Sequence, residues 1–365
     1  MVSSTIQALR YLRSWSSGGG EFHEEELSLD RGFDRVPATL FRPPGARGGL
    51  PGWVVLHGIT RPGRAHPSLL RFCRALTSTG AAVLLPEIPE WRELELAPDR
   101  AVPTIRAAIL ALDARPETET GRTGVVGFSF GAPQVLIAAR DPDLRGHLST
   151  VVGFGGYCHL RDTLRFQFTG EFQEGLQTHS LRPDPYGRWV VGANYLTKIP
   201  GLEDAADVAT ALHTLASAAG ERRIESWDPL YDPVKADLRK GIAAGRRELF
   251  DLFAPMADRE PDREASLELV EGLCSAAEAT DPYLDPARWL HEVQVPVHLV
   301  HGREDHLIPF TETLRLREAL PAAPTRATIT GLFAHSEGKR IASAVGQAAE
   351  GMRFFNALRA ILASV

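Results

Sequence analysis

Short apolar runs alternate with amphipathic stretches along the first 156 residues of the chain. Short runs rich in β-branched residues are typical of strands, whereas apolar residues at three- and four-residue spacing are typical of helices. The fully apolar run 82–86 predicts a strand covered on both faces, as in a parallel sheet. The pattern predicts strands at 38–44, 53–56, 82–86, 125–128 and 150–156, and helices at 68–79, 101–114 and 134–140. This strict alternation predicts a doubly wound, mostly parallel α/β sheet.

A long segment then interrupts the sheet pattern, which resumes with a strand at 297, a helix at 311–320 and a last strand at 328–330. The interruption is far longer than an ordinary connection. Its apolar spacing predicts helices at 204–219, 233–244, 246–257 and 265–276. We therefore expect a large helical cap over the carboxyl ends of the strands. The predicted divisions are an N-terminal extension (1–35), an α/β core (36–156 and 292–365) and a mainly helical cap (157–291).

The strand that begins at Val125 ends in Gly127-Phe128-Ser129-Phe130-Gly131, and a helix pattern follows at once. A serine between two glycines at a strand-to-helix turn is typical of a nucleophile elbow, in which a Cβ at either glycine would collide with a neighbouring element. Ser129 is therefore the candidate nucleophile. The alternative interpretation is an ordinary surface turn.

Further upstream, the strand 53–56 is closed by His57-Gly58-Ile59-Thr60. A sharp turn there can aim a backbone N–H at the oxyanion of a tetrahedral intermediate, together with the N–H of the residue after the nucleophile. Ile59 and Phe130 are the candidate donors. We interpret His57 as a structural residue that shapes the loop through hydrogen bonds.

Two later loops carry an acid and a histidine. The strand at 297 leads through Gly302 into Glu304-Asp305, and the last strand leads into a loop with His335. Asp305 is the preferred orienting acid and Glu304 the fallback. His335 follows Asp305 by 30 residues, which suffices for one helix and one strand, as in one βαβ unit.

Ser129, Asp305 and His335 follow the order Ser, Asp, His, and on these motifs the chain resembles the α/β-hydrolase superfamily over about residues 36–155 and 290–360. The resemblance implies the α/β-hydrolase fold, Ser129 as nucleophile, His335 as general base and Asp305 as its orienting acid. The loop His57-Gly58-Ile59-Thr60 lacks the Gly-Gly run of the hormone-sensitive-lipase type, which argues against that subgroup.

These residues predict a serine hydrolase that cleaves a small or medium-sized carboxylic ester through an acyl-enzyme, without a cofactor or a metal. The same triad serves amide, peptide, thioester and carbon–carbon bond hydrolases, so these remain alternatives. A non-catalytic binding protein on the same fold is a further alternative. A serine nucleophile argues against haloalkane dehalogenases and epoxide hydrolases, which need a carboxylate.

The front of the predicted cap is rich in aromatic and basic residues. One interpretation is a pocket wall with an arginine that meets a substrate carboxylate, and the other is a small core that the cap needs in order to fold. The residues concerned are Tyr157, His159, Arg161, Arg165, Phe166, Phe168, Phe172, Tyr186, Arg188, Trp189 and Tyr195.

Composition narrows the classes that remain. The chain has 365 residues, a net charge of −6 and no concentrated basic patch, which argues against a nucleic-acid partner and leaves a small-molecule substrate. Its three cysteines form no CxxC motif, which argues for reduced core residues and against a metal site. Neither a signal peptide nor a membrane span is evident, so a cytoplasmic location is expected. The oligomeric state is left open.

Overall fold

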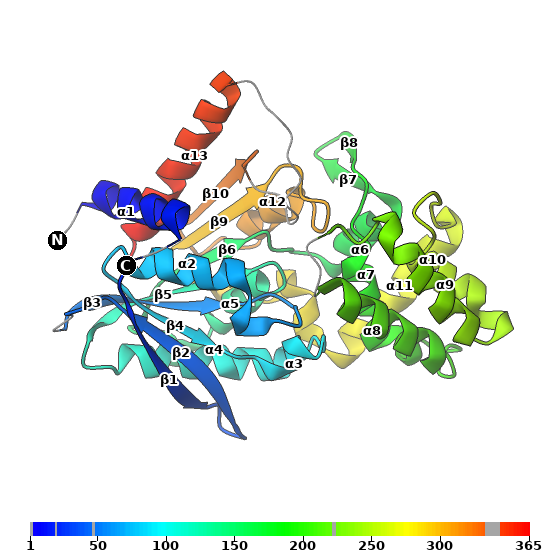
Figure 1. The fold of residues 1–365 in the computed structure, drawn as a ribbon, viewed down its shortest axis with the longest axis horizontal. Coiled ribbons are helices and arrows are strands. Elements are labelled where there is room, and N and C mark those ends of the chain that lie inside the picture. The colour runs from blue at the N-terminus through cyan, green and yellow to red at the C-terminus, as the bar shows by residue number, and fades with distance from the viewer. Residues whose placement is uncertain (1–2, 19, 46–47, 221–223, 333–343) are drawn as a thin grey trace.

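The computed structural model describes residues 3–18, 20–45, 48–220, 224–332 and 344–365. Its centre is an eight-stranded sheet in the order β1-β2-β4-β3-β5-β6-β9-β10 (Figure 1). The first two pairings, β1 with β2 and β2 with β4, are antiparallel, and all the others are parallel. The strands are β1 (His23–Asp30), β2 (Arg35–Arg42), β3 (Leu50–Leu56), β4 (Ala82–Pro86), β5 (Thr118–Phe128), β6 (Leu148–Phe154), β9 (Val297–Gly302) and β10 (Thr325–Thr330).

Helices cover both faces of this sheet, as the alternating pattern predicts. Successive residues of β3 point to opposite faces. Trp53 and Val55 pack in the hydrophobic cluster that contains α1 (Ser4–Ser17), α2 (Pro67–Thr77) and α13 (Ala344–Leu362). Val54 and Leu56 pack in the other cluster. That second cluster contains α4 (Pro98–Asp113), α5 (Gly131–Ala138) and α12 (Thr311–Glu318), and the short helix α3 (Pro89–Arg92) adds Trp91 to it.

The described residues of the predicted N-terminal extension (1–35) pack against the sheet. β1 pairs with β2 over its full length and forms one edge of the sheet. Ala8 and Tyr11 of α1 are buried in the same cluster as α2 and α13. The sequence of β1, His-Glu-Glu-Glu-Leu-Ser-Leu-Asp, is mostly polar because an edge strand buries little of its surface.

The segment between β6 and β9 is mostly helical. The four helices predicted from apolar spacing correspond to α8 (Ala206–Gly220), α9 (Asp232–Gly241), α10 (Arg247–Phe253) and α11 (Arg263–Thr280). The structure adds two helices and a hairpin that the pattern did not predict. These are α6 (Leu160–Thr169), α7 (Tyr186–Tyr195) and the strands β7 (Glu171–Glu174) and β8 (Gln177–Ser180).

The helical insertion lies to one side of the sheet, as Figure 1 shows. It is drawn in green and yellow, next to the loops that leave the sheet toward α5 and α12. Across the described ranges, no helix combines the length and the apolar character of a membrane span.

Candidate active site

Ser129 occupies the turn between β5 and α5. Its φ of +52° lies in the left-handed region, which side chains other than glycine rarely adopt. The Ser129 N–H donates to the Phe154 carbonyl at 2.7 Å, and the Ser129 carbonyl accepts from the Ala132 N–H at 3.0 Å. These bonds hold the strained residue between the neighbouring strand β6 and the first turn of α5. Such strain at a non-glycine residue is a mark of functional sites.

The two flanking glycines leave no room for a side chain, as the sequence predicts. A Cβ on Gly127 would lie 2.3 Å from the Gly131 carbonyl oxygen, and one on Gly131 would lie 3.2 Å from the His57 carbonyl oxygen. The first contact is with backbone and cannot be relieved by a side-chain rotation. The glycines therefore permit the sharp reversal at Ser129.

The loop after β3 lies against this turn. A Cβ on Gly58 would be 3.7 Å from the Cβ of Ser129, so no side chain separates the two segments. The His57 ring fixes the peptide between Gly58 and Ile59, because Nδ1 lies 2.8 Å from the Gly58 carbonyl oxygen. A carbonyl can only accept, so Nδ1 carries a proton. Since the carbonyl and the N–H of one trans peptide point in opposite directions, this bond also sets the direction of the Ile59 N–H.

His57 makes further contacts that account for its structural role. Its Nε2 lies 3.1 Å from the Ile88 nitrogen, and also 3.1 Å from a carboxylate oxygen of Glu87. The ring packs edge-on against Trp91, with centroids 5.4 Å apart, and His57 is 1% exposed. With both nitrogens engaged inside the core, His57 shapes the loop, as its position in the sequence predicts.

Asp305 follows β9 at the same edge of the sheet as Ser129. Its Oδ1 accepts hydrogen bonds from the Leu307 and Ile308 N–H groups, both at 2.9 Å. Its Oδ2 lies 3.3 Å from Nε2 of His301, a ring that is also fixed by Thr313 at 2.7 Å. Asp305 is 2% exposed.

Its neighbour Glu304 is exposed to solvent. Burial therefore favours Asp305 over Glu304 as an acid that acts inside the protein.

His335 lies outside the described residues. The residues before it, Gly331 and Leu332, follow β10 at the carboxyl edge of the sheet, next to β9. The strands that precede Ser129, Asp305 and His335 in the chain, β5, β9 and β10, are thus parallel strands whose carboxyl ends lie at one edge of the sheet.

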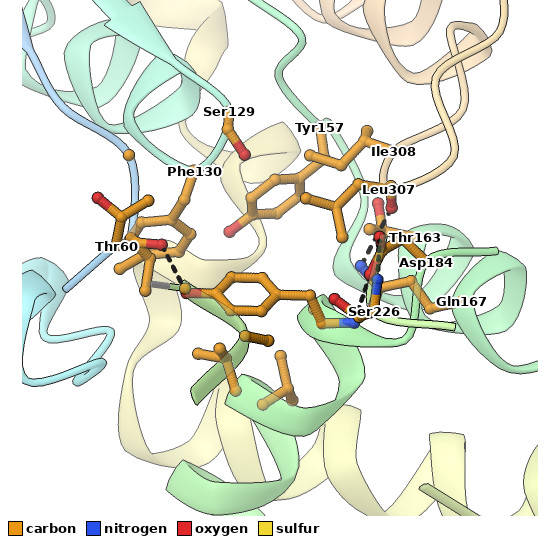
Figure 2. Close-up of a pocket in the computed structure, with 18 of the residues that line it drawn as sticks. Thr60, Ser129, Phe130, Tyr157, Thr163, Gln167, Asp184, Ser226, Leu307 and Ile308 are labelled. Carbon is orange, nitrogen blue, oxygen red and sulfur yellow. Dashed lines mark hydrogen bonds between the residues drawn. The ribbon is translucent and has the colours of Figure 1, made fainter. Parts of the chain in front are cut away.

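A cavity of about 340 Å³ opens at Ser129. Its volume is within the usual range of small-molecule sites. The core contributes Gly58, Ile59, Ser129 and Phe130, and the Asp305 loop contributes His306, Leu307 and Ile308. Figure 2 shows the Ser129 hydroxyl pointing into the space bounded by Phe130 and Tyr157. The helical insertion supplies most of the remaining wall, mainly through Tyr157, Leu160, Thr163, Leu164, Gln167, Asp184, Tyr186, Gly187, Val190, Val191, Ile224 and Ser226.

The aromatic and basic front of the insertion divides between wall and core. Tyr157 and Tyr186 line the cavity, and Tyr186 donates to the Ile59 carbonyl at 2.9 Å, which ties α7 to the loop after β3. Trp189 is fully buried. Arg188 donates to the Phe253 and Gln167 carbonyls, at 2.8 Å each. The described wall of the cavity contains no arginine, so it gives no support to the interpretation in which an arginine of the pocket wall meets a substrate carboxylate.

Among the described residues, no group of three His, Cys, Asp or Glu side chains is placed to hold a metal ion.

The chain is similar to known proteins in its structure but not in its sequence. No family model and no curated protein matches the sequence. Among solved structures, the acylaminoacyl peptidase of Pyrococcus horikoshii superposes with a TM-score of 0.50 at 12% identity, over 95% of this chain and 42% of the peptidase. A bacterial brefeldin A esterase, a homologue of human hormone-sensitive lipase, superposes with a TM-score of 0.47 at 16% identity, over 99% of this chain and 86% of the esterase.

This chain has the α/β-hydrolase fold. In that fold a sharp turn joins a central strand to a helix, and here the turn at Ser129 joins β5 to α5 in the same way. Sequence reasoning missed Gln167 in the wall of the site. It also left open whether Tyr157 and Tyr186 belong to the wall or to the core, because burial in either place selects the same residue types.

The elbow of this α/β-hydrolase fold yields a stability test. We expect Gly127→Ala to lower the free energy of unfolding by about 3 kcal/mol, because the added methyl meets the Gly131 backbone at the turn. Equilibrium unfolding in urea measures the change. Gly351→Ala is the matched control, since a Cβ on this helical glycine of α13 meets nothing within 4 Å. An unchanged midpoint for Gly127→Ala would contradict the close packing of the elbow.

Proposed function

We propose that this chain is a serine hydrolase that cleaves a small or medium-sized carboxylic ester through Ser129, His335 and Asp305. The observation that carries the proposal is the conformation of Ser129. A non-glycine residue is held at φ +52° on a strand-to-helix turn, beside the Gly58 loop and facing a cavity. The fold of hydrolases of known structure supports the same assignment.

In the proposed reaction His335 removes the proton of Ser129 while the serine oxygen attacks the ester carbonyl. Asp305 orients the histidine and stabilises the imidazolium that forms. The Ile59 and Phe130 N–H groups stabilise the oxyanion, each by about 3 kcal/mol. The alcohol leaves after it receives the proton from His335, and water then hydrolyses the acyl-enzyme by the same steps. Side chains, backbone N–H groups and water suffice for both steps.

The helical insertion would act as the cap that limits substrate size. Its residues form most of the wall of a cavity of about 340 Å³, which suits small or medium-sized acyl or alcohol groups. The same geometry would serve an amide or thioester carbonyl, because the triad acts on the acyl carbon and the cap selects the leaving group.

Active-site labelling tests the proposal. We expect a fluorophosphonate probe to label the folded wild-type protein, and mass spectrometry of the digested protein to place the label on Ser129. Heat-denatured protein is the control and should remain unlabelled, since activation of Ser129 requires the folded site.

In parallel, p-nitrophenyl esters and matched p-nitroanilides distinguish ester from amide cleavage. Labelling at another cavity serine, Ser68 or Ser226, would contradict the assignment. A folded protein that neither labels nor turns over either substrate would favour a binding protein.

A further inference from the structure

Three buried polar atoms in the cavity wall have no hydrogen-bond partner among the described residues. They are Oγ1 of Thr60, the Tyr157 hydroxyl and Oε1 of Gln167. Tyr157 and Gln167 are the most deeply buried of the three residues, each 4% exposed, whereas Thr60 is half-buried. Burial of a polar group without a partner opposes folding, so most proteins avoid it. Unsatisfied groups in the wall of a site are explained when the bound molecule supplies the missing partner.

Tyr157 stands beside the candidate nucleophile. Its ring stacks on that of Phe130, the residue after Ser129, with centroids 6.2 Å apart and planes at 24°. Figure 2 shows the side chain projecting into the cavity near the Ser129 hydroxyl. Burial raises the pKa of the Tyr157 phenol, so it stays protonated and able to donate a hydrogen bond at neutral pH. Its natural partner is an oxygen atom of the substrate close to the scissile bond.

Gln167 presents the opposite kind of group elsewhere in the cavity. Its Nε2 donates to the Leu307 carbonyl at 3.2 Å, which fixes the amide so that Oε1 is the atom left without a donor. Gly187 makes room for this arrangement, since a Cβ there would lie 2.2 Å from Nε2. In Figure 2 Gln167 lies with Asp184 and Ser226, on the side of the cavity away from Thr60 and Phe130.

Apolar side chains line much of the rest of the same cavity, among them Leu160, Leu164 and Val190. We propose that Tyr157 and Gln167 are substrate-binding residues that select an ester whose cavity-bound part is an apolar chain carrying a hydroxyl or amide N–H away from the scissile carbonyl. The donor on the chain meets Gln167, and an oxygen near the reacting carbon meets Tyr157. This inference rests on the proposed hydrolase function and specifies its substrate class.

Matched ester pairs test the selection. Each pair has the same length, and one member carries a terminal hydroxyl where the other has a methyl. One series places the pair in the acyl part of p-nitrophenyl esters, and the other places it in the alcohol part of acetate esters. We expect wild-type kcat/KM to favour the hydroxyl member by at least about tenfold in one series, because the methyl member leaves Oε1 unpaired. Equal kcat/KM values throughout both series would overturn the proposal.

Gln167→Leu should abolish that preference, so that the kcat/KM values of the two members become about equal. The variant also loses the bond to the Leu307 carbonyl, but a structural effect common to both members cancels in their ratio. Gln134→Leu is the matched control, because Gln134 is a fully buried glutamine whose amide likewise has no partner among the described residues, and it lies outside the cavity wall. If Gln167→Leu fails to fold, Gln167→Met removes the same oxygen with a side chain of similar length. A preference that persists in the folded variant overturns the role of Gln167.

Tyr157→Phe should lower kcat/KM of both members by about tenfold and leave their ratio unchanged. Tyr231→Phe, at a buried tyrosine outside the cavity, should leave kcat/KM as in the wild type. No loss in Tyr157→Phe overturns the role of Tyr157. Labelling of Ser129 by a small fluorophosphonate separates the two levels of the proposal. A protein that is labelled but shows no preference for the hydroxyl member would contradict only the proposed substrate class. A protein that is neither labelled nor active would contradict the proposed hydrolase function as well.

Discussion

Replacement of Ser129 by alanine is expected to lower kcat for p-nitrophenyl ester hydrolysis by about 10⁵- to 10⁶-fold and to abolish fluorophosphonate labelling. Loss of the nucleophile removes the acyl-enzyme route, and what remains is the stabilisation that the oxyanion donors and binding give to direct attack by water. The folded structure should persist, because alanine and serine have the same steric restriction at φ +52°. Burst and steady-state kinetics on purified protein measure the loss.

A second serine provides the matched control for that experiment. Ser149 lies in β6 and donates to the Thr123 carbonyl at 3.1 Å, outside the cavity wall. Ser149→Ala should keep both labelling and turnover. If Ser129→Ala keeps its labelling and more than a small fraction of its kcat, while its thermal unfolding matches the wild type, Ser129 is not the nucleophile.

The core of the fold was predictable because its strands are buried on both faces. The run 82–86 was predicted to the residue, since a short, continuous apolar segment that follows a glycine turn and ends in a proline is typical of a strand buried on both faces. Gly127 and Gly131 gave a second local signal, which predicted the sharp turn between β5 and α5. The two backbones come so close at this turn that neither position has room for a Cβ atom.

Other elements gave weaker signals for identifiable physical reasons. β1 exposes most of its side chains, so its alternation rests on Leu27 and Leu29 alone. In the insertion, α6 and α7 bury polar residues such as Gln167 and Arg188 together with aromatic ones, which blurs the helical pattern. Their packing on other parts of the chain, for example Tyr186 on the Ile59 carbonyl, depends on contacts between segments 127 residues apart. Single-sequence periodicity contains no information about such contacts.

The site residues divide in the same way. Chain order and local motifs led to Ser129 and to the loop at Gly58, whose close approach the structure confirms. The sequence pattern could favour Asp305 over Glu304 as the orienting acid but could not decide between them, because both residues follow the same strand. Their environments differ only after folding, when Asp305 is buried among backbone N–H groups and His301 while Glu304 stays exposed.

The burial of Asp305 leads to the second prediction with a large effect on kcat. Asp305→Asn is expected to lower kcat by about 10⁴-fold, because an amide of the same shape cannot stabilise an imidazolium and favours the wrong tautomer of the partner histidine. The change also affects the fold. The amide oxygen can still accept from the Leu307 and Ile308 N–H groups, but the bonds weaken with the loss of charge, so a modest decrease in thermal stability should accompany the kinetic loss.

Glu304→Gln distinguishes the orienting role of Asp305 from a purely structural one. It removes the exposed neighbouring charge and should leave both kcat and the unfolding temperature close to wild type. A purely structural Asp305 would give the opposite pattern in Asp305→Asn, with a lower unfolding temperature and a nearly unchanged kcat well below that temperature. We would measure kcat and thermal unfolding on the same preparations of both variants. The two measurements together decide whether the Asp305 carboxylate takes part in catalysis or only stabilises the loop that follows β9. Loss of kcat in Glu304→Gln alone would transfer the orienting role to the exposed acid.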